Sequence, residues 1–215
     1  RYAFFTCLQQ SVMNFGILMI QGLVNSFGTA IMAAFAAAVK IDTLAYMPVQ
    51  EFGNAFSLFI SQNHGAKHQD RVRVGIHTAV QVSITFCIVI SAIIWIFARP
   101  LMQIFVDADE TSIIAEGVRY LHIEGTFYWG IGCLFLLYGF YRAVKRPGMS
   151  VVLTVISLGM RVLLAYLLSA FVGVTGIWAA IPVGWILADV TGLVYYRYHK
   201  KELMKFTGPP LEGEL

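Results

Sequence analysis

The sequence predicts an all-α integral membrane protein, a bundle of six transmembrane helices, and three observations support this fold class. Of its 215 residues, 58% are hydrophobic and only 13% are charged, about half the charged share of an average soluble domain. Six apolar stretches can be drawn, each near the ~20 residues that a helix needs to cross a bilayer. Basic residues gather in alternate connections between these stretches, as they do in multi-pass membrane proteins.

The apolar stretches give approximate bounds for the spans. We expect them at about 3–26, 30–62, 75–98, 117–141, 148–172 and 174–197. The second stretch is too long for a straight, upright helix, so it should tilt, kink at Pro48 or extend into the membrane interface. In this interpretation residues 1–205 form one domain. The polar tail, 206–215, has the composition of a disordered segment.

The first span carries a row of amide side chains on one face. At about 100° per residue, four of its polar residues lie within about 60° of one another. They are Gln10, Asn14, Gln21 and Asn25. Lipid offers no hydrogen-bond partners to amides, so we expect this face to contact protein or water.

The second span holds three charged residues, Lys40, Asp42 and Glu51, with Pro48 among them. Lys40 and Glu51 return to nearly the same helical face, and Asp42 points roughly the opposite way unless Pro48 resets the phase. The residues on or beside the Lys40–Glu51 stripe are Thr43, Met47, Gln50 and Asn54. Charges inside a hydrophobic helix typically line a transport pathway. The alternative is that they pair with neighbouring helices only to fix packing.

The remaining spans differ in their charge. The third has no charged residue between 76 and 98 and is predicted to be scaffold. The fourth carries Glu124, with Tyr128 continuing its face, and Glu124 could pair with Lys40 at similar depth. Arg161 and Asp189 lie near mid-depth on the fifth and sixth spans. Because intramembrane charges usually pair with one another, we expect a structural ion pair between them.

Several functional classes are excluded or disfavoured by missing motifs. The three cysteines, Cys7, Cys87 and Cys133, show no CxxC or Cys/His spacing, so neither a metal site nor a disulfide framework is predicted. No hydrolase or metalloprotease motif occurs, which argues against an enzyme. The formal charge of +3 comes from short loops and indicates no nucleic-acid partner. No cofactor is expected.

The distribution of basic residues predicts the orientation in the membrane. Eleven lysines and arginines fall on one side of the six spans and two, Arg99 and Arg119, on the other. We expect the chain to lie in the plasma membrane. Because the basic side is normally cytoplasmic, both ends of the chain should face the cytoplasm. The chain opens at Arg1 and is apolar from Tyr2, which gives it the appearance of a segment of something longer.

Ordered sequence motifs resemble one family of transporters. The helix containing MPVQEFGNAFSLFISQNHGA, which leads into a basic loop, resembles the multidrug and toxic compound extrusion (MATE) family. So do LQQSVMNFGILMIQGLVNSFG before it and the pair RVLLAYLL and GIWAAIPVGWILAD after it. The resemblance covers residues 1–205. The motif QNxGA after a proline-containing span is by itself moderately specific for this family, and the motifs in this order are together strong evidence for the resemblance.

The resemblance implies one lobe of a twelve-helix antiporter. Members of the family have two six-helix lobes and exchange Na⁺ or H⁺ for organic cations through a central cavity. This sequence is similar to the second lobe, so the implied partners are the lipid bilayer, a missing first lobe and cationic small molecules. The family also has members with an acid on the fourth helix of this lobe, where Glu124 lies. Where some members carry an acid on the first helix of the lobe, this sequence has amides.

Residues and resemblance together give a hypothesis for the site. Glu51 is expected to couple transport to the cation, with Glu124 as the second candidate. The cavity would be lined by Lys40, Gln50, Asn54, Tyr128 and the amides of the first span, which are Gln10, Asn14, Gln21 and Asn25. Two alternatives stay open: a flippase for lipid-linked precursors from the same superfamily, or a membrane subunit or fragment that does not transport.

Overall fold

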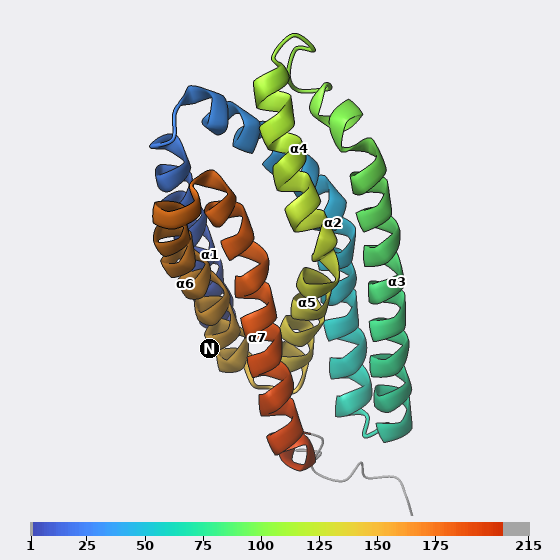
Figure 1. Ribbon diagram of the computed structural model, residues 1–215. Coiled ribbons are helices and arrows are strands. Elements are labelled where there is room, and N and C mark those ends of the chain that lie inside the picture. The colour runs from blue at the N-terminus through green and yellow to red at the C-terminus, as the bar shows by residue number, and fades with distance from the viewer. Residues whose placement is uncertain (1, 204–215) are drawn as a thin grey trace, which may run out of the picture.

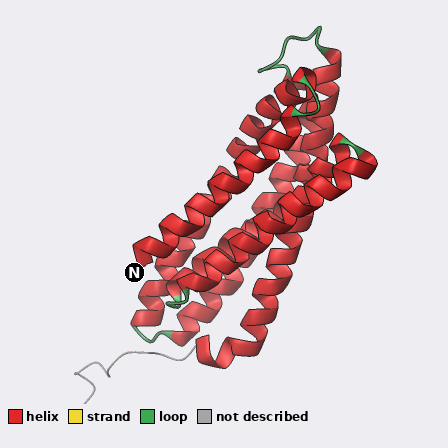
Figure 2. Cartoon of the chain, turned by 90° about the vertical axis from the view of Figure 1, so that its left-hand side faces the viewer, coloured by secondary structure: helices red, strands yellow, loops and turns green. Residues whose placement is uncertain are grey.

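The computed structural model describes residues 2–203, and every regular element in that range is a helix (Figures 1 and 2). The helices are α1 (Tyr2–Asn25), α2 (Thr29–Gly65), α3 (Gln69–Met102), α4 (Thr111–Thr126), α5 (Tyr128–Ala143), α6 (Pro147–Val172) and α7 (Val174–Leu203). Within the described range five helices are long and apolar enough to cross a membrane, and α4 with α5 makes a sixth span if the pair is counted as one. The tail predicted to be disordered lies outside the described residues.

The fourth span is broken, which the prediction of one helix over 117–141 did not foresee. α4 and α5 meet at Phe127 with a bend of 53°. Next to the bend, the Thr126 hydroxyl donates a hydrogen bond of 2.7 Å to the carbonyl of His122. The amide of Gly130 bonds the carbonyl of Phe127 at 2.8 Å, a three-residue turn in place of the α-helical pattern. Side-chain bonds of this kind compete with the helical ladder and bend it.

Pro48, by contrast, does not break its helix. α2 runs as a single element from Thr29 to Gly65 with Pro48 inside it. Figure 1 shows the first turns of α2 crossing one end of the molecule before the helix descends between its neighbours. The first turns of α2, which cross the end of the molecule, therefore account for the excess length of this span. The interrupted span of the bundle is the α4–α5 pair.

The helices pack as a bundle in which α2 contacts α1, α3, α4 and α5, while α6 and α7 form a closely packed hairpin that α1 covers. The hairpin turns at Gly173, whose φ of 63° is a left-handed conformation that glycine adopts without strain. Gly28, with φ of 101°, serves the same purpose between α1 and α2. The connections alternate between the two ends of the bundle, as consecutive membrane spans require.

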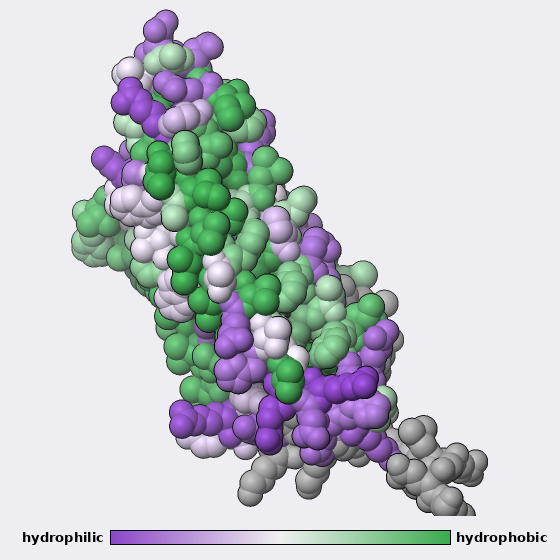
Figure 3. All heavy atoms as spheres, turned by 90° about the vertical axis from the view of Figure 1, so that its right-hand side faces the viewer, coloured by the Kyte–Doolittle hydropathy of each residue, from purple (hydrophilic) through white to green (hydrophobic). Residues whose placement is uncertain are grey.

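The outer face of the bundle is apolar. Figure 3 shows hydrophobic side chains across the middle of one face and hydrophilic side chains gathered at its two ends. Exposed apolar residues are frequent on α3, among them Ile88, Val89, Ile93, Ile96 and Phe97. A soluble protein rarely exposes so large an apolar surface, so this face is suited to contact lipid.

Candidate functional site

Three carboxyl groups are buried within residues 2–203, and two of them, Asp42 on α2 and Glu124 in the last turns of α4, lie close to the α4–α5 break; the third is Asp189 on α7. Asp42 is 5% exposed and Glu124 is 0% exposed. Within residues 2–203, neither carboxylate oxygen of Glu124 has a hydrogen-bond partner. A buried polar group without a partner costs free energy, and such groups in a membrane protein concentrate at functional sites.

Two tyrosines donate hydrogen bonds to the carboxylate of Asp42. The hydroxyl of Tyr128 donates a hydrogen bond of 2.6 Å to Asp42 Oδ1, and that of Tyr120 donates one of 3.3 Å to Oδ2. Tyr120, Glu124 and Tyr128 follow one another at intervals of four residues across the α4–α5 break. The charges of Asp42 and Glu124 are close enough to interact with each other, and both interact with Arg161 of α6. We call Asp42, Tyr120, Glu124 and Tyr128 the acidic cluster.

The break at Phe127 matters for the chemistry of this cluster. Where a helix is interrupted, the carbonyl groups of its last turn lose their α-helical partners, and here the carbonyl of Glu124 accepts a hydrogen bond of 2.9 Å from the amide of Phe127 instead. In transporters, unwound backbone carbonyls beside acidic side chains bind Na⁺ or H⁺. An acid next to an interrupted helix is therefore found at Glu124. Among the described residues no group of three His, Cys, Asp or Glu side chains is placed to hold a metal ion.

Glu51 lies elsewhere, on the exposed side of α2. Its Oε2 accepts a hydrogen bond of 3.2 Å from Asn54 Nδ2, and Asn54 Oδ1 accepts one of 2.9 Å from Arg142 of α5. The Glu51 side chain is exposed. Its neighbour Gln50 is half-buried and reaches two clefts.

These clefts lie where α1 faces α2 and α5. The smaller, about 70 Å³, is lined by Gln9, Gln10, Met13, Gln50, Asn54, Phe135, Tyr138 and Arg142. The larger, about 110 Å³, is lined by Met13, Ile17, Tyr46, Gln50, Ile131, Leu134, Phe135, Tyr138, Thr154, Ser157, Leu158, Arg161 and Trp185. Of the predicted cavity residues, Gln10, Gln50 and Asn54 thus come together. Asn14 bonds Gln10 at 3.3 Å without lining either cleft. Gln21 and Asn25 are exposed further along α1.

Comparison with known proteins places this architecture in a family. The MatE family model matches residues 3–167. The chain belongs to the MatE family. Over 199 residues it is 31% identical to the "Probable multidrug resistance protein YpnP" of Bacillus subtilis, a match that covers 92% of this chain and 44% of the relative.

Solved structures of MatE-type transporters share the fold. The Vibrio cholerae MATE transporter VcmN superimposes with a TM-score of 0.84 at 22% identity, covering 92% of this chain and 45% of the other. A MOP superfamily transporter from Pyrococcus furiosus does so with a TM-score of 0.85 at 19% identity and the same coverages. The chain spans a little less than half the length of the relatives it matches.

Lys40 does not join either group of site residues in this MatE lobe. Its side chain is exposed, and its ammonium lies 5.7 Å from the centre of the Phe105 ring. Among residues 2–203, no ion pair links Lys40 to Glu124 or to Glu51. Lys40 is thus near the α3–α4 connection and away from the acidic cluster.

The predicted ion pair between Arg161 and Asp189 is wrong for this structure. Both carboxylate oxygens of Asp189 and the Nε of Arg161 are buried without hydrogen-bond partners. The guanidinium of Arg161 instead lies 5.8 Å from the ring of Trp185. The sequence places the two residues at similar depth, but it does not fix the rotation of α6 against α7, and in the structure the Asp189 carboxylate lies beside Gly130 of α5.

Sequence reasoning missed several residues of these sites, among them Asp42, Tyr120 and Arg142. Asp42 was recognised as an intramembrane charge but left out of the site, because the wheel turned it away from Glu51. The spacing of Tyr120, Glu124 and Tyr128 was the available signal, since it places two phenols on either side of an acid on one helical face. Nothing in the sequence showed that Arg142, at the end of a span, reaches back to Asn54.

Proposed function

We propose that this chain acts as one six-helix lobe of a secondary transporter that exports organic cations in exchange for Na⁺ or H⁺. A second lobe would complete the transporter in the plasma membrane, with both ends of this chain in the cytoplasm. Membership of the MatE family and a relative named for multidrug resistance support the transport class. The observation that carries the proposal is Glu124, fully buried without a partner beside an interrupted span.

The acidic cluster supplies the coupling in this proposal. Asp42 is satisfied by two phenols, whereas Glu124 has no donor. Binding of a proton or a Na⁺ at Glu124 removes the cost of a buried, unpaired charge. Because Glu124 lies next to the α4–α5 break, its occupancy can bias the angle between these helices. Release of the cation then favours the other arrangement of the lobe.

The clefts beside α1 provide the surface for the transported molecule. Gln10, Gln50 and Asn54 offer amide groups there, and Glu51 lies on the same side of α2. In a complete transporter this side would face the second lobe across the cavity. Glu51 would then attract a cationic drug to the cavity, while Glu124 binds the coupling ion.

Charge-neutral substitutions test the proposal. Glu124→Gln and Asp42→Asn should reduce the cation-dependent part of drug efflux by about 5- to 150-fold, the range of an ordinary coupling free energy. Glu51→Gln is the matched control on the exposed face and should keep the Na⁺ or pH dependence. Efflux from cells and cation-driven uptake into vesicles are compared at equal expression. Unchanged cation dependence in both buried variants would exclude the acidic cluster, and loss in Glu51→Gln alone would assign coupling to Glu51.

A second function has one observation in its favour. The two clefts beside α1 are lined by Arg142 and Arg161 and by no acidic residue. A cationic, amide-lined cavity suits an anionic amphiphile, such as a lipid-linked precursor, better than a cationic drug. The same vesicle assay separates the two: with Arg142→Gln, export of an anionic substrate should fall, whereas export of a cation should not.

A further inference from the structure

We infer that a cleft between the start of α3 and the end of α7 binds the headgroup of an anionic phospholipid, with an acyl chain in the apolar groove beside it. The inference depends on the chain lying in a bilayer and not on what it transports. The cleft is separate from the acidic cluster and from the clefts beside α1, with which it shares no lining residue.

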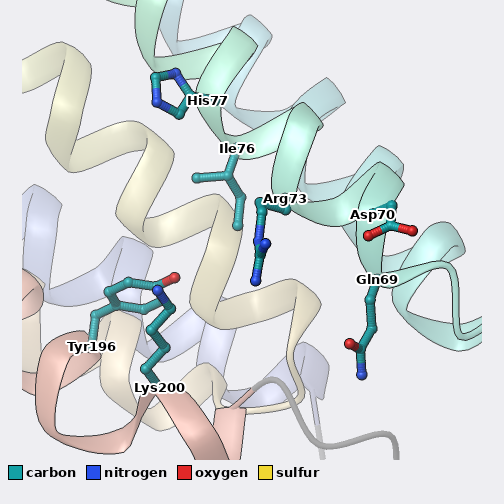
Figure 4. Close-up of a pocket in the computed structure, with 7 residues that line it drawn as sticks. All are labelled: Gln69, Asp70, Arg73, Ile76, His77, Tyr196 and Lys200. Carbon is teal, nitrogen blue, oxygen red and sulfur yellow. The ribbon is translucent and has the colours of Figure 1, made fainter.

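The cleft has room for a headgroup and the charge to hold one. Its volume is about 630 Å³, and it is lined by Gln69, Asp70, Arg73, Ile76, His77, Tyr196 and Lys200. Figure 4 shows Arg73 reaching from α3 and Lys200 from α7 into the space between the two helices. Asp70 is the single acid of the lining, so the basic side chains outnumber it. Phosphate groups are bound by arginine and lysine in this way.

The two cations are available to a ligand. Within residues 2–203 neither Arg73 nor Lys200 forms an ion pair, although other basic residues at the same end do, as Arg146 with Glu202 shows. Lys200 places its ammonium 5.9 Å from the centre of the Tyr196 ring, which holds it at the edge of the cleft. Gln69 and His77 add further polar side chains to the two charges.

An apolar groove continues from this cleft along the helices. It has a volume of about 110 Å³ and is lined by Phe56, Ile76, Val80, Cys133, Leu136, Leu137, Phe140, Leu193 and Tyr196. Ile76 and Tyr196 line both spaces, so the two adjoin. From Arg73 to Val80, and from Lys200 to Leu193, the helices advance about 10 Å, away from the charged end. The polar part therefore lies at the end of the bundle and the apolar part deeper in the span.

This layout identifies a lipid rather than a free anion or a protein. A phospholipid joins a phosphate to an acyl chain over the same depth. Val80 and Leu193 are exposed at the groove, so a chain can enter from the bilayer. Basic residues at the ends of membrane spans attract anionic lipids, and tyrosine is favoured at that level of the membrane.

Lipid binding by the intact protein in detergent tests the inference, by native mass spectrometry and by thermal shift. Phosphatidylglycerol should bind more tightly than phosphatidylcholine with identical acyl chains. The double variant Arg73→Gln and Lys200→Gln should weaken phosphatidylglycerol binding by about tenfold. The matched control, Arg71→Gln with Arg197→Gln, removes two exposed charges from the same helices outside the cleft and should keep the affinity.

A further variant separates lipid from free phosphate. Leu193→Trp fills the apolar groove without changing charge and should weaken phosphatidylglycerol binding while leaving any binding of inorganic phosphate unchanged. Equal affinity for the two lipids, or equal losses in the cleft and control double variants, would overturn the inference. So would inorganic phosphate protecting the protein as strongly as the lipid does.

Discussion

At the scale of single residues, the hydroxyl groups of Tyr120 and Tyr128 lower the free-energy cost of burying the Asp42 carboxylate. Asp42 would be an unpaired charge inside the bundle if Tyr120 and Tyr128 did not donate to its two oxygens. Glu124 has no such donors. Within residues 2–203, Asp42 has hydrogen-bond donors and Glu124 has none, so of these two acids Glu124 gains more from binding a cation.

Removal of the Tyr128 hydroxyl should destabilise the protein. Tyr128→Phe deletes the 2.6 Å hydrogen bond to Asp42, and we expect the free energy of unfolding to fall by about 1–3 kcal/mol. Tyr120→Phe deletes the 3.3 Å bond and should cost less. Thermal denaturation of the purified protein measures both. Tyr166→Phe, at an exposed position, is the control, and a loss there equal to that in Tyr128→Phe would contradict the assignment.

Helical wheels predicted part of this site and missed the rest for a definite reason. Glu124 and Tyr128 were selected because they share a face of one span. Asp42 was not selected, because the polar face of α2 was defined by Glu51, and a helical wheel does not show which face of α2 packs against α4. That information lies in helix-on-helix packing, which involves residues far apart in sequence. The same limit explains the wrong pairing of Arg161 with Asp189.

At the scale of elements, hydrophobic length was a reliable guide and proline was not. The predicted bounds agree with α1, α2 and α6 to within about three residues, and the predicted start of the last span agrees with that of α7, which continues further, to Leu203. This agreement is expected because about 20 apolar residues must be helical in lipid. Proline removes only one backbone N–H donor from a helix, and α2 continues through Pro48. In contrast, α4 and α5 are interrupted at Phe127, where there is no proline. Breaks of the second kind depend on local hydrogen bonds, such as that of Thr126, that a hydropathy pattern does not contain.

Glycines at two helix crossings should tolerate no added methyl group. A Cβ on Gly139 of α5 would lie 2.5 Å from the carbonyl oxygen of Gly53 on α2, and one on Gly184 of α7 would collide with that of Ser157 on α6. Backbone cannot move away as a side chain can, so Gly139→Ala and Gly184→Ala should each cost about 1–3 kcal/mol. The midpoint of thermal unfolding and the monodisperse fraction after purification report the loss.

The chain supplies its own controls for these crossings. A Cβ on Gly22 or on Gly159 would meet no atom within 4 Å. Alanine is a better helix former than glycine by about 1 kcal/mol, so Gly22→Ala and Gly159→Ala should leave stability unchanged or raise it slightly. Losses in these two variants as large as in the crossing variants would show that close backbone contact is not the cause.

At the scale of the whole molecule, the charge pattern and the alternation of connections agree. The α2–α3 and α5–α6 connections and the end of α7 share one end of the bundle, while the α1–α2, α3–α4 and α6–α7 connections share the other (Figure 1). Lysine and arginine gather at the first end, and the acidic residues Asp107, Asp109 and Glu110 at the second. Composition and span counting therefore predict the architecture well, because both follow directly from the bilayer.

The orientation that this asymmetry predicts can be measured by cysteine labelling in cells. A reporter cysteine is placed by His68→Cys in the α2–α3 connection or by Asp109→Cys in the α3–α4 connection, in a background in which Cys7, Cys87 and Cys133 are replaced by serine. Since the basic end should be cytoplasmic, an impermeant maleimide added to intact cells should label position 109 and spare position 68. Permeabilised cells are the control and should label both positions. Labelling of position 68 in intact cells, with position 109 protected, would reverse the orientation and would place the anionic-lipid cleft in the outer leaflet.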